Sequence, residues 1–259
     1  MNDPLVTLVL AYFNEEDFIG ATLASLLAQT DRRFALLLVD NMSSDGSEQR
    51  VLEALAGNRD IPVIMMKEKE KGQLHALRRG LCESRTPYVA TLDADTFYPP
   101  DYVEKAISML ESDPSISTAM AFNVGESGRR RASAFQWFSA RFWPAKCHAG
   151  GAGHCYRRSM LERAGGFDAS IWPFVLFDHE IAHRIRKHGR FAYRRDHVIH
   201  ASERRGDRSS SWNMIERLLY RFLPRQRMDW FFYEFLGPRF ERRKLNSVAL
   251  RKGRWRSEP

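Results

Sequence analysis

The stretch at residues 86–101 constrains this chain most, because an apolar, strand-like run leads directly into two carboxylates. It reads TPYVATLDADTFYPPD: β-branched and aromatic residues precede Asp93 and Asp95, and two prolines then introduce a helix. Side chains two residues apart in extended backbone point to the same face, so both carboxylates can reach one hard cation. Open α/β sheets bind ligands at the carboxyl ends of their strands. We therefore expect a ligand site here.

Strands and helices alternate along the first 112 residues. Apolar runs predict strands at residues 5–11, 34–39 and 61–66, and a fourth strand that ends at Asp93. Amphipathic helices are expected to begin at residues 14–16, after the Ser- and Asp-rich turn at 41–48, at Gly72 and at Asp101. This alternation predicts an α/β fold with a largely parallel sheet and right-handed crossovers.

The regular alternation ends after residue 112. The expected elements are a strand at 117–124, a loop at 125–133, an aromatic helix at 135–143, a glycine-rich segment at 149–156, a short helix capped by Ser159, a helix at 177–189 and a strand at 190–200. We therefore predict one domain at 1–200, with halves at 1–112 and 113–200, and an extension at 201–259.

Composition and charge limit the class of protein. The chain has 259 residues and is 44% hydrophobic, which suits one compact domain with an appendage. Its net charge of +8 is confined to the extension: residues 1–200 hold 25 Lys plus Arg and 25 Asp plus Glu, whereas residues 201–259 hold 15 and 7. No apolar run approaches the ~20 residues of a membrane span. The acidic N-terminus is unlike a signal peptide, and three cysteines do not make a disulfide framework, so we expect a cytoplasmic protein.

Four motifs follow one another in the order of a known family. They are FNEE after the first strand, LVDNMSSDG at the second, DAD at the fourth, and GGFD followed by FDHEIAHRIRKHG. Over roughly residues 5–200 they resemble the family 2 glycosyltransferases of GT-A fold. The resemblance implies a Rossmann-like nucleotide-sugar half at 1–112 and an acceptor half at 113–200. It also implies transfer of a sugar from a nucleotide diphosphate sugar, with inversion and a divalent metal.

The resemblance assigns the DAD motif to the metal and the donor. Asp95 matches the family position that ligates the metal, while Asp93 and Ala94 match positions that face the ribose and the metal shell. His200 matches a third metal ligand of some members, and a structural histidine is the alternative. Oxygen ligands favour Mn²⁺ or Mg²⁺, which would neutralise the charge that grows on the leaving diphosphate. Two solvated loop carboxylates are the alternative for the motif.

Asp40 matches the family aspartate that binds the base of a uridine-type nucleotide, and turn capping is its alternative role. By resemblance the same pocket contains Ala11, Tyr12, Asn14 and Glu15. The chain has Asn41 and Met42 where the family commonly has an acid and a glycine, and Ala11 replaces a proline, so the identity of the base stays open. Residues implied to approach the nucleotide from the next helix are Lys71, Gly72 and Arg79. A solvated basic helix face is the alternative for these three.

Inversion requires a base on the far side of the sugar from the diphosphate, because the acceptor hydroxyl loses its proton as it attacks. Alignment with the family at Arg184 assigns this base to Asp178 and a further acid to Glu180, whereas Phe177 replaces the family's first acid. The alternative role of Asp178 is helix capping, which is worth about 1 kcal/mol of stability.

A group of cysteines and histidines precedes and follows the glycines of segment 149–156. Its members are Cys147, His148, His154 and Cys155. They do not have the CxxC or HxxxH spacing of structural zinc sites, so we predict an acceptor-side loop and assign no metal to it.

The extension at 201–259 combines its positive excess with ten aromatic residues. Apolar side chains recur at helical spacing, with charged residues opposite; they are Trp212, Ile215, Leu218, Leu219 and Phe222. This pattern is typical of a helix in a membrane interface, where each cation gains about 1 kcal/mol from anionic lipid. We expect peripheral binding to the inner face of the cell membrane; packing on the catalytic domain or an oligomer contact is the alternative. The absence of a recognised module in the sequence argues against nucleic acid as a partner.

Three functions remain after these steps. The sequence favours a metal-dependent inverting hexosyltransferase that uses a nucleotide diphosphate sugar, UDP-type favoured, and a hydroxyl of a cell-surface glycan or lipid-linked acceptor. A polyprenyl-phosphate sugar transferase is the alternative enzyme, and its phosphate acceptor needs no protein base. The alternative of another class is a non-catalytic basic protein that binds membranes or nucleic acid.

Overall fold

The computed structural model describes residues 3–146, 151–202 and 213–248. Its strands are β1 (Val6–Tyr12), β2 (Phe34–Asp40), β3 (Val63–Lys67), β4 (Tyr88–Asp93), β5 (Thr96–Phe97), β6 (Ile116–Asn123), β7 (His154–Arg157) and β8 (Arg190–Ala201). They form one sheet in the order β3-β2-β1-β4-β7-β6-β8-β5. The first four and the β6/β8 pair are parallel, whereas β7 runs antiparallel between β4 and β6, and β5 antiparallel to β8.

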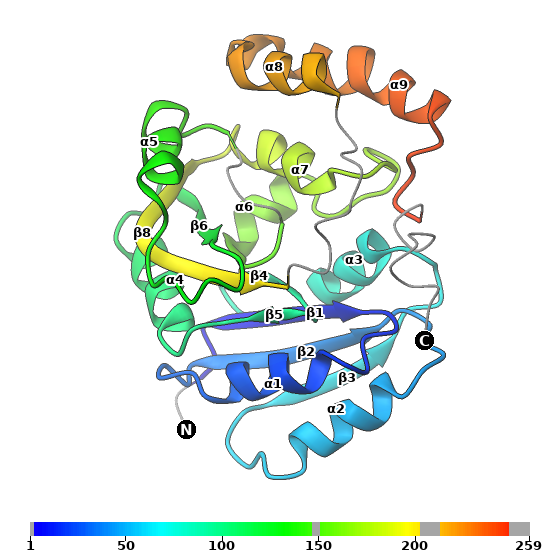
Figure 1. Cartoon of the computed structure of the whole chain (residues 1–259), viewed down its shortest axis with the longest axis vertical. Coiled ribbons are helices and arrows are strands. Elements are labelled where there is room, and N and C mark those ends of the chain that lie inside the picture. Colours follow the sequence, from blue (N-terminus) through cyan, green and yellow to red (C-terminus); the bar gives the residue numbers. More distant parts are fainter. Residues whose placement is uncertain (1–2, 147–150, 203–212, 249–259) are drawn as a thin grey trace.

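The helices cover both faces of this sheet, except the last two, which lie away from it (Figure 1). They are α1 (Ile19–Leu27), α2 (Ser47–Leu55), α3 (Gln73–Glu83), α4 (Tyr102–Glu111), α5 (Ala134–Phe142), α6 (Arg158–Arg163), α7 (Phe177–Ile185), α8 (Met214–Phe222) and α9 (Gly237–Arg242), with a 3₁₀ turn at Arg225–Arg227 and a π-helix at Trp230–Leu236. Helices α1, α2 and α4 share a core with Leu8 and Leu10, whereas α3, α6 and α7 share one with Val9. Alternate residues of β1 therefore enter opposite layers, which explains its unbroken apolar sequence.

One predicted helix start and two predicted helix caps are wrong. Helix α1 begins at Ile19 without a side-chain cap, because Asn14 adopts a positive φ of 51° and its carboxamide oxygen accepts the N–H of Ser44 instead. Helix α2 begins after Gly46, also without a side-chain cap, and α6 begins after Arg157, so Ser159 lies inside it. The polar side chains expected to cap these helices either bond to another loop or do not cap at all. Residue spacing in the sequence does not show which of these outcomes occurs.

Two short strands were not predicted, and both depend on distant partners. Strand β7 lies in the glycine-rich segment, where Cys155 pairs with Ala90 of β4 on one side and with Ala119 of β6 on the other. Strand β5 has only two residues, and it exists because Phe97 pairs with His200. Such strands carry too little local signal to be read from the sequence.

The aromatic part of the extension packs on the main domain. Phe231, Phe232 and Phe240 are buried in a cluster with Trp172 and Val175. The indole Nε1–H of Trp172 donates to the carbonyl of Val175 at 2.9 Å, so its polar group is satisfied within this cluster. Phe231, Phe232 and Phe240 thus pack on the main domain, which is the alternative that the sequence left open.

Candidate active site

The DAD turn is held rigidly at the carboxyl end of β4. The N–H of Asp93 donates to the hydroxyl of Tyr98 at 2.9 Å, and the Oδ1 of Asp93 accepts the Nε2–H of Gln73 at 2.9 Å. The carbonyl of Ala94 accepts the hydroxyl of Thr22 at 2.8 Å. Contacts from α1, from α3 and from the segment after β5 thus fix one turn. Neither Gln73 nor Tyr98 carries a sequence signal for this role, because both act through tertiary contacts.

Strand β5 brings Asp95 and His200 to one edge of the sheet. The carbonyl of Asp95 accepts the N–H of Ser202 at 3.0 Å, which extends the pairing of Phe97 with His200. The Nδ1 of His200 lies 2.9 Å from the carbonyl of Gly125, and a carbonyl can only accept. Neutral His200 therefore carries its proton on Nδ1, and its Nε2 lone pair is available to a cation.

The donors at this edge fit a cation that is shared with a substrate. Within the parts of the chain that the structure describes, no cluster of three or more His, Cys, Asp or Glu side chains could hold a metal alone. Mg²⁺ sites that use nucleotide phosphates commonly have only one or two protein carboxylates. Asp95, which is 5% exposed, and His200 line the same cavity, and this donor set meets that requirement. The imidazole makes Mn²⁺ a better match than Mg²⁺.

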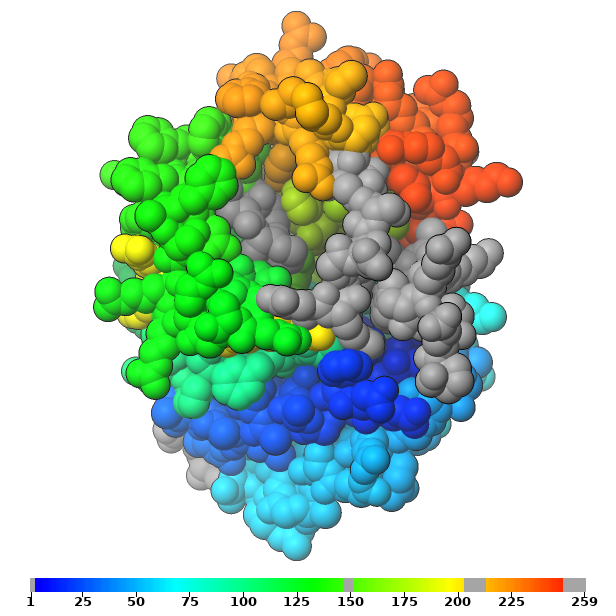
Figure 2. Space-filling view, viewed as in Figure 1, coloured from blue at the N-terminus to red at the C-terminus, as the bar shows by residue number. Residues whose placement is uncertain are grey.

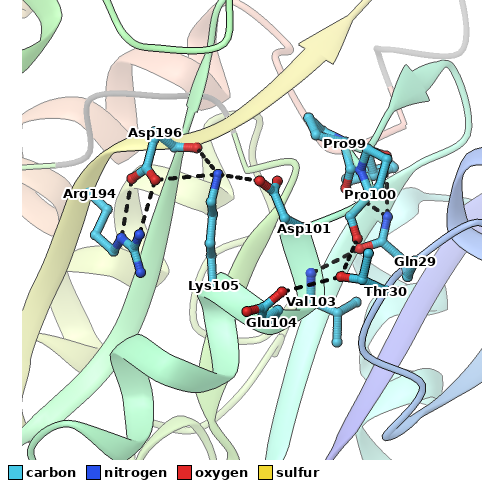
Figure 3. Close-up of polar contacts among 11 residues, drawn as sticks. Gln29, Thr30, Pro99, Pro100, Asp101, Val103, Glu104, Lys105, Arg194 and Asp196 are labelled. Atoms are coloured by element: carbon cyan, nitrogen blue, oxygen red, sulfur yellow. Dashed lines mark hydrogen bonds and ion pairs between the residues drawn. The ribbon is translucent and has the colours of Figure 1, made fainter.

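The cavity beside these residues has a volume of about 910 Å³. It is lined by α1, the segment 95–105, the 126–131 loop and β8. Its far wall is fixed by Lys105, whose Nζ lies 2.7 Å from a carboxylate oxygen of Asp101 and 3.4 Å from one of Asp196 (Figure 3). Gln29 donates to the carbonyl of Pro99 and accepts the N–H of Val103, which ties α1 to the start of α4. This wall is therefore rigid.

Two loops meet at the ends of β1 and β2, where the sequence predicted nucleotide binding. Tyr12 and Asp40 are paired in register and buried, next to Ala11. The Oδ1 of Asp40 accepts the N–H of Ser43 at 2.9 Å, so the turn-capping role of Asp40 is present. The N–H of Glu15 donates to the hydroxyl of Ser47 at 2.7 Å, joining the two loops. Burial and the nearby carboxylate of Asp40 raise the pKa of Tyr12, which keeps its phenol protonated.

Asn41 occupies the position where the family commonly has an acid, and its side chain makes hydrogen bonds to the backbone. Its Oδ1 accepts the N–H of Gly72 at 2.8 Å, and its Nδ2–H group donates to the carbonyl of Glu70 at 2.6 Å. The start of α3 is therefore tied to the end of β2, next to exposed Lys71. Arg79 lies 3.2 Å from Glu83 on the exposed face of α3, which agrees with the alternative of a solvated helix face.

Asp178 lies in the first turn of α7 and is brought to the end of β4 by glycine packing. A Cβ on Gly151 would lie 2.8 Å from the Cβ of Asp178. The carbonyl of Gly151 accepts the hydroxyl of Thr91 at 2.8 Å, and Thr91 is two residues before Asp93. Burial by itself would raise the pKa of the Asp178 carboxyl, but His179, whose Nδ1 lies 3.0 Å from Oδ1, and His154 lower it below its usual value. Asp178 is thus ionised at neutral pH and can accept a proton.

Glu180 has a structural role in place of the catalytic one that the sequence predicted. Its side chain is fully buried, and its Oε1 accepts the Nε–H of Arg184 at 2.7 Å and the hydroxyl of Tyr233 at 2.5 Å. Arg184 also donates to the carbonyls of Ala164 and Gly166. The acid and the arginine of the motif therefore hold the GGFD segment and the extension against α7.

A family model settles the classification. The model described as "Glycosyl transferase family 2" matches residues 7–165, which is more than half of the chain and includes the nucleotide loops, the DAD turn and the first glycine of GGFD. The chain belongs to glycosyl transferase family 2. The resemblance drawn from the motifs is thereby confirmed.

Two curated proteins illustrate the sequence similarity. The poly-beta-1,6-N-acetyl-D-glucosamine synthase of Staphylococcus aureus (strain MSSA476) is 29% identical over 111 residues, which are 43% of this chain and 26% of that protein. An uncharacterized glycosyltransferase of Haemophilus influenzae is 29% identical over 119 residues, which are 46% of this chain and 36% of that protein. The matched part thus spans about a quarter to a third of these relatives.

Solved glycosyltransferases share the fold over nearly the whole chain. The mannosyltransferase PcManGT from Pyrobaculum calidifontis, in complex with GDP-Man and Mn²⁺, superposes with a TM-score of 0.66 at 21% identity, covering 96% of this chain and 74% of that one. TarS 1-349 of S. aureus in complex with UDP gives 0.63 at 16% identity, covering 95% and 74%. The predicted GT-A fold is confirmed by this similarity.

The cysteine and histidine group has no metal-site geometry where it is described. Cys147 and His148 lie outside the described residues. His154 and Cys155 are fully buried on β7, and burial raises the pKa of the Cys155 thiol, which keeps it protonated and unreactive. In this family 2 member, His154 instead lowers the pKa of Asp178.

Proposed function

We propose that this chain is a metal-dependent inverting glycosyltransferase that uses a nucleotide diphosphate sugar. The observation that carries the proposal is the convergence on one sheet edge of three features: the loops of Tyr12 and Asp40, the DAD turn, and Asp178. The last two are linked through Gly151, which accepts a hydrogen bond from Thr91 of β4 and packs against Asp178. Such an edge is where open α/β sheets bind ligands.

The chain's residues divide the chemistry between them. Asp40, Tyr12 and the backbone of residues 14–15 would bind the nucleoside, with Lys71 and Gly72 at its side. Asp95 and His200 would hold Mn²⁺ or Mg²⁺, which when bound supplies positive charge for the diphosphate. Asp93, oriented by Gln73, would face the ribose. The Asp178 carboxylate would take the proton from the acceptor hydroxyl as that oxygen attacks the anomeric carbon and the nucleotide diphosphate leaves.

The donor is proposed to be a UDP-sugar. Four of the similar solved structures contain UDP or UDP-GlcNAc, whereas the mannosyltransferase contains GDP-Man. Asp40 supports a uridine-type base, although Asn41 is committed to Gly72 and does not supply a second acid. A thermal-shift screen of UDP, GDP and their sugars with Mn²⁺ distinguishes these bases, because a selective ligand stabilises the folded state.

The acceptor is proposed to be a hydroxyl on a cell-surface glycan or a lipid-linked sugar, reached from the cytoplasmic side of the membrane. The similarity to a polysaccharide synthase supports this class of acceptor. The arginines that line the cavity, Arg130 and Arg131, favour a second candidate in which the acceptor is a polyprenyl phosphate. That reaction would not require Asp178 as a base.

Replacement of Asp178 tests the proposal. A positioned base contributes roughly 10²- to 10⁴-fold to the rate, so Asp178→Asn should lower transfer by that factor while nucleotide affinity with Mn²⁺ is kept. Asp60→Asn is the matched control, because that side chain is 77% exposed and lies far along the chain from the DAD turn. Wild-type turnover by Asp178→Asn would favour the phosphate acceptor. No nucleotide-sugar turnover by the wild type, or turnover that Asp95→Asn does not lower, would instead indicate a non-catalytic protein.

A further inference from the structure

Helix α5 presents an apolar face to solvent. Phe135, Phe138 and Phe142 occur at i, i+3 and i+7, so they lie on one side of the helix. The opposite side packs through Ala140 on a core that contains Phe122. Large aromatic side chains gathered on one exposed helix face are uncommon on a monomeric protein and mark an interaction surface.

Helix α8 presents a second apolar face. Its exposed apolar residues are Met214, Ile215, Leu218 and Phe222. The other side of α8 is anchored, because buried Glu216 lies 2.6 Å from a guanidinium nitrogen of Arg243 and Leu219 packs on the aromatic cluster of the extension. The seven apolar residues of α5 and α8 are each between 48% and 77% exposed.

The two faces form one continuous surface. The rings of Trp143 and Phe222 lie 6.1 Å apart, and the guanidinium of Arg221 lies 4.4 Å from the centre of the Trp143 ring. Arg221 also donates to the hydroxyl of Ser139 on α5 at 2.8 Å. Figure 2 shows the α5 region and α8 side by side at the upper left of the molecule. We call the seven exposed apolar residues of the two helices the α5/α8 surface.

The segments that contain α5 and α8 are mainly basic. Residues 127–146 contain five basic residues and no acidic residue. Residues 213–228 contain four arginines and a single acid, the buried Glu216. An apolar face bordered by arginines is complementary to an anionic bilayer, because the apolar side chains enter the interface while the cations meet the headgroups.

We propose that the α5/α8 surface docks this protein on an anionic lipid bilayer. The inference rests on the proposed function, because docking would bring the cavity to a lipid-linked acceptor. It changes the prediction made from the sequence: three of the seven residues come from α5, in the main domain, whereas Phe231, Phe232 and Phe240 of the extension are buried. No helix in the described part of the chain has the length and apolar character needed to cross a membrane, and docking at the interface needs none.

Vesicle sedimentation with the full chain tests this proposal. The wild type should sediment with vesicles that contain phosphatidylglycerol, more weakly at high salt, and should not sediment with phosphatidylcholine alone. Phe135→Ser with Phe138→Ser, and separately Ile215→Ser with Phe222→Ser, should each lower the partition coefficient at least about tenfold. Leu52→Ser is the matched control, because Leu52 is 51% exposed but lies on α2. This variant should bind vesicles as the wild type does.

Two results would overturn the inference. One is a folded wild type that does not sediment with anionic vesicles. This result includes the case in which the α5/α8 surface joins two copies of the chain, so that ultracentrifugation shows a dimer that the same serine variants abolish. The other is serine variants that bind vesicles as well as the wild type. A thermal shift with UDP and Mn²⁺ on the same proteins keeps the two proposals separate, because lost nucleotide binding with intact vesicle binding refutes only the proposed function.

Discussion

Gly151→Ala should lower turnover without unfolding the protein. The added Cβ would lie 2.8 Å from the Cβ of Asp178, whereas ordinary contact begins at 3.4 Å, so the two groups must separate by about 0.6 Å (3.4 minus 2.8). Because Gly151 is held by Thr91, the movement falls on Asp178 as well as on the loop. A misplacement of about 1 Å in a reacting group can cost 10²-fold in rate, so we expect kcat to fall by roughly 10- to 100-fold.

The assay is steady-state transfer, with nucleotide affinity measured on the same preparations. Gly57→Ala is the control, because a Cβ there meets nothing within 4 Å. The affinity of Gly151→Ala for nucleotide and Mn²⁺ should equal that of the wild type, since Asp40 and Asp95 are not displaced. Unchanged kcat in Gly151→Ala would refute the placement of Asp178 at the acceptor. A loss shared by Gly57→Ala would mean that the effect is not local.

Three further substitutions test the supporting structure. Tyr233→Phe removes the 2.5 Å hydrogen bond to buried Glu180 and should lower the free energy of unfolding by about 1–3 kcal/mol in urea; unchanged stability would contradict the structural role of Glu180. Burial lowers the pKa of His197 to about 3, so between pH 6.5 and 3 only the unfolded chain binds this proton, and acid favours unfolding. His197→Phe should therefore lose roughly 2–3 kcal/mol less stability than the wild type when urea unfolding is compared at pH 6.5 and 4.5; equal losses would show that His197 is not buried neutral. Gln73→Ala removes one hydrogen bond to the Oδ1 of Asp93 and should weaken nucleotide binding with Mn²⁺ by roughly 3- to 10-fold in calorimetry. An unchanged affinity would show that Gln73 does not contribute to nucleotide binding.

The nucleotide half of the fold could be predicted because its signals are local. The runs at β1, β2 and β4 are apolar throughout, as expected for strands buried on both faces, and their predicted ends agree with the structure to within two residues. The DAD motif and Asp40 occur where these strands end, so their place at the sheet edge followed from the parallel topology. The acceptor half was less predictable, since β5 and β7 are short strands that exist only through pairing with distant partners.

Residue types alone could not separate the members of the base motif. Asp178 and Glu180 are acids two positions apart on one helix, and both were assigned to catalysis. A turn of α7 advances 3.6 residues, so these side chains point to different sides: Asp178 faces Gly151, and Glu180 faces Arg184 and Tyr233. The partner on the extension lies 53 residues away along the chain, a separation at which no local pattern operates.

The sequence by itself determined the family, the α/β alternation and the carboxylates at the ends of β2 and β4, because short motifs and apolar runs are local features of the chain. Tertiary structure alone decided which polar groups meet. It set Gln73 and Tyr98 on the DAD turn, Asp95 beside His200, and Asp178 against Gly151. It also buried Phe231, Phe232 and Phe240 of the extension and left the α5/α8 surface exposed. Amphipathic spacing marks an apolar face, but only packing determines whether protein or solvent covers it.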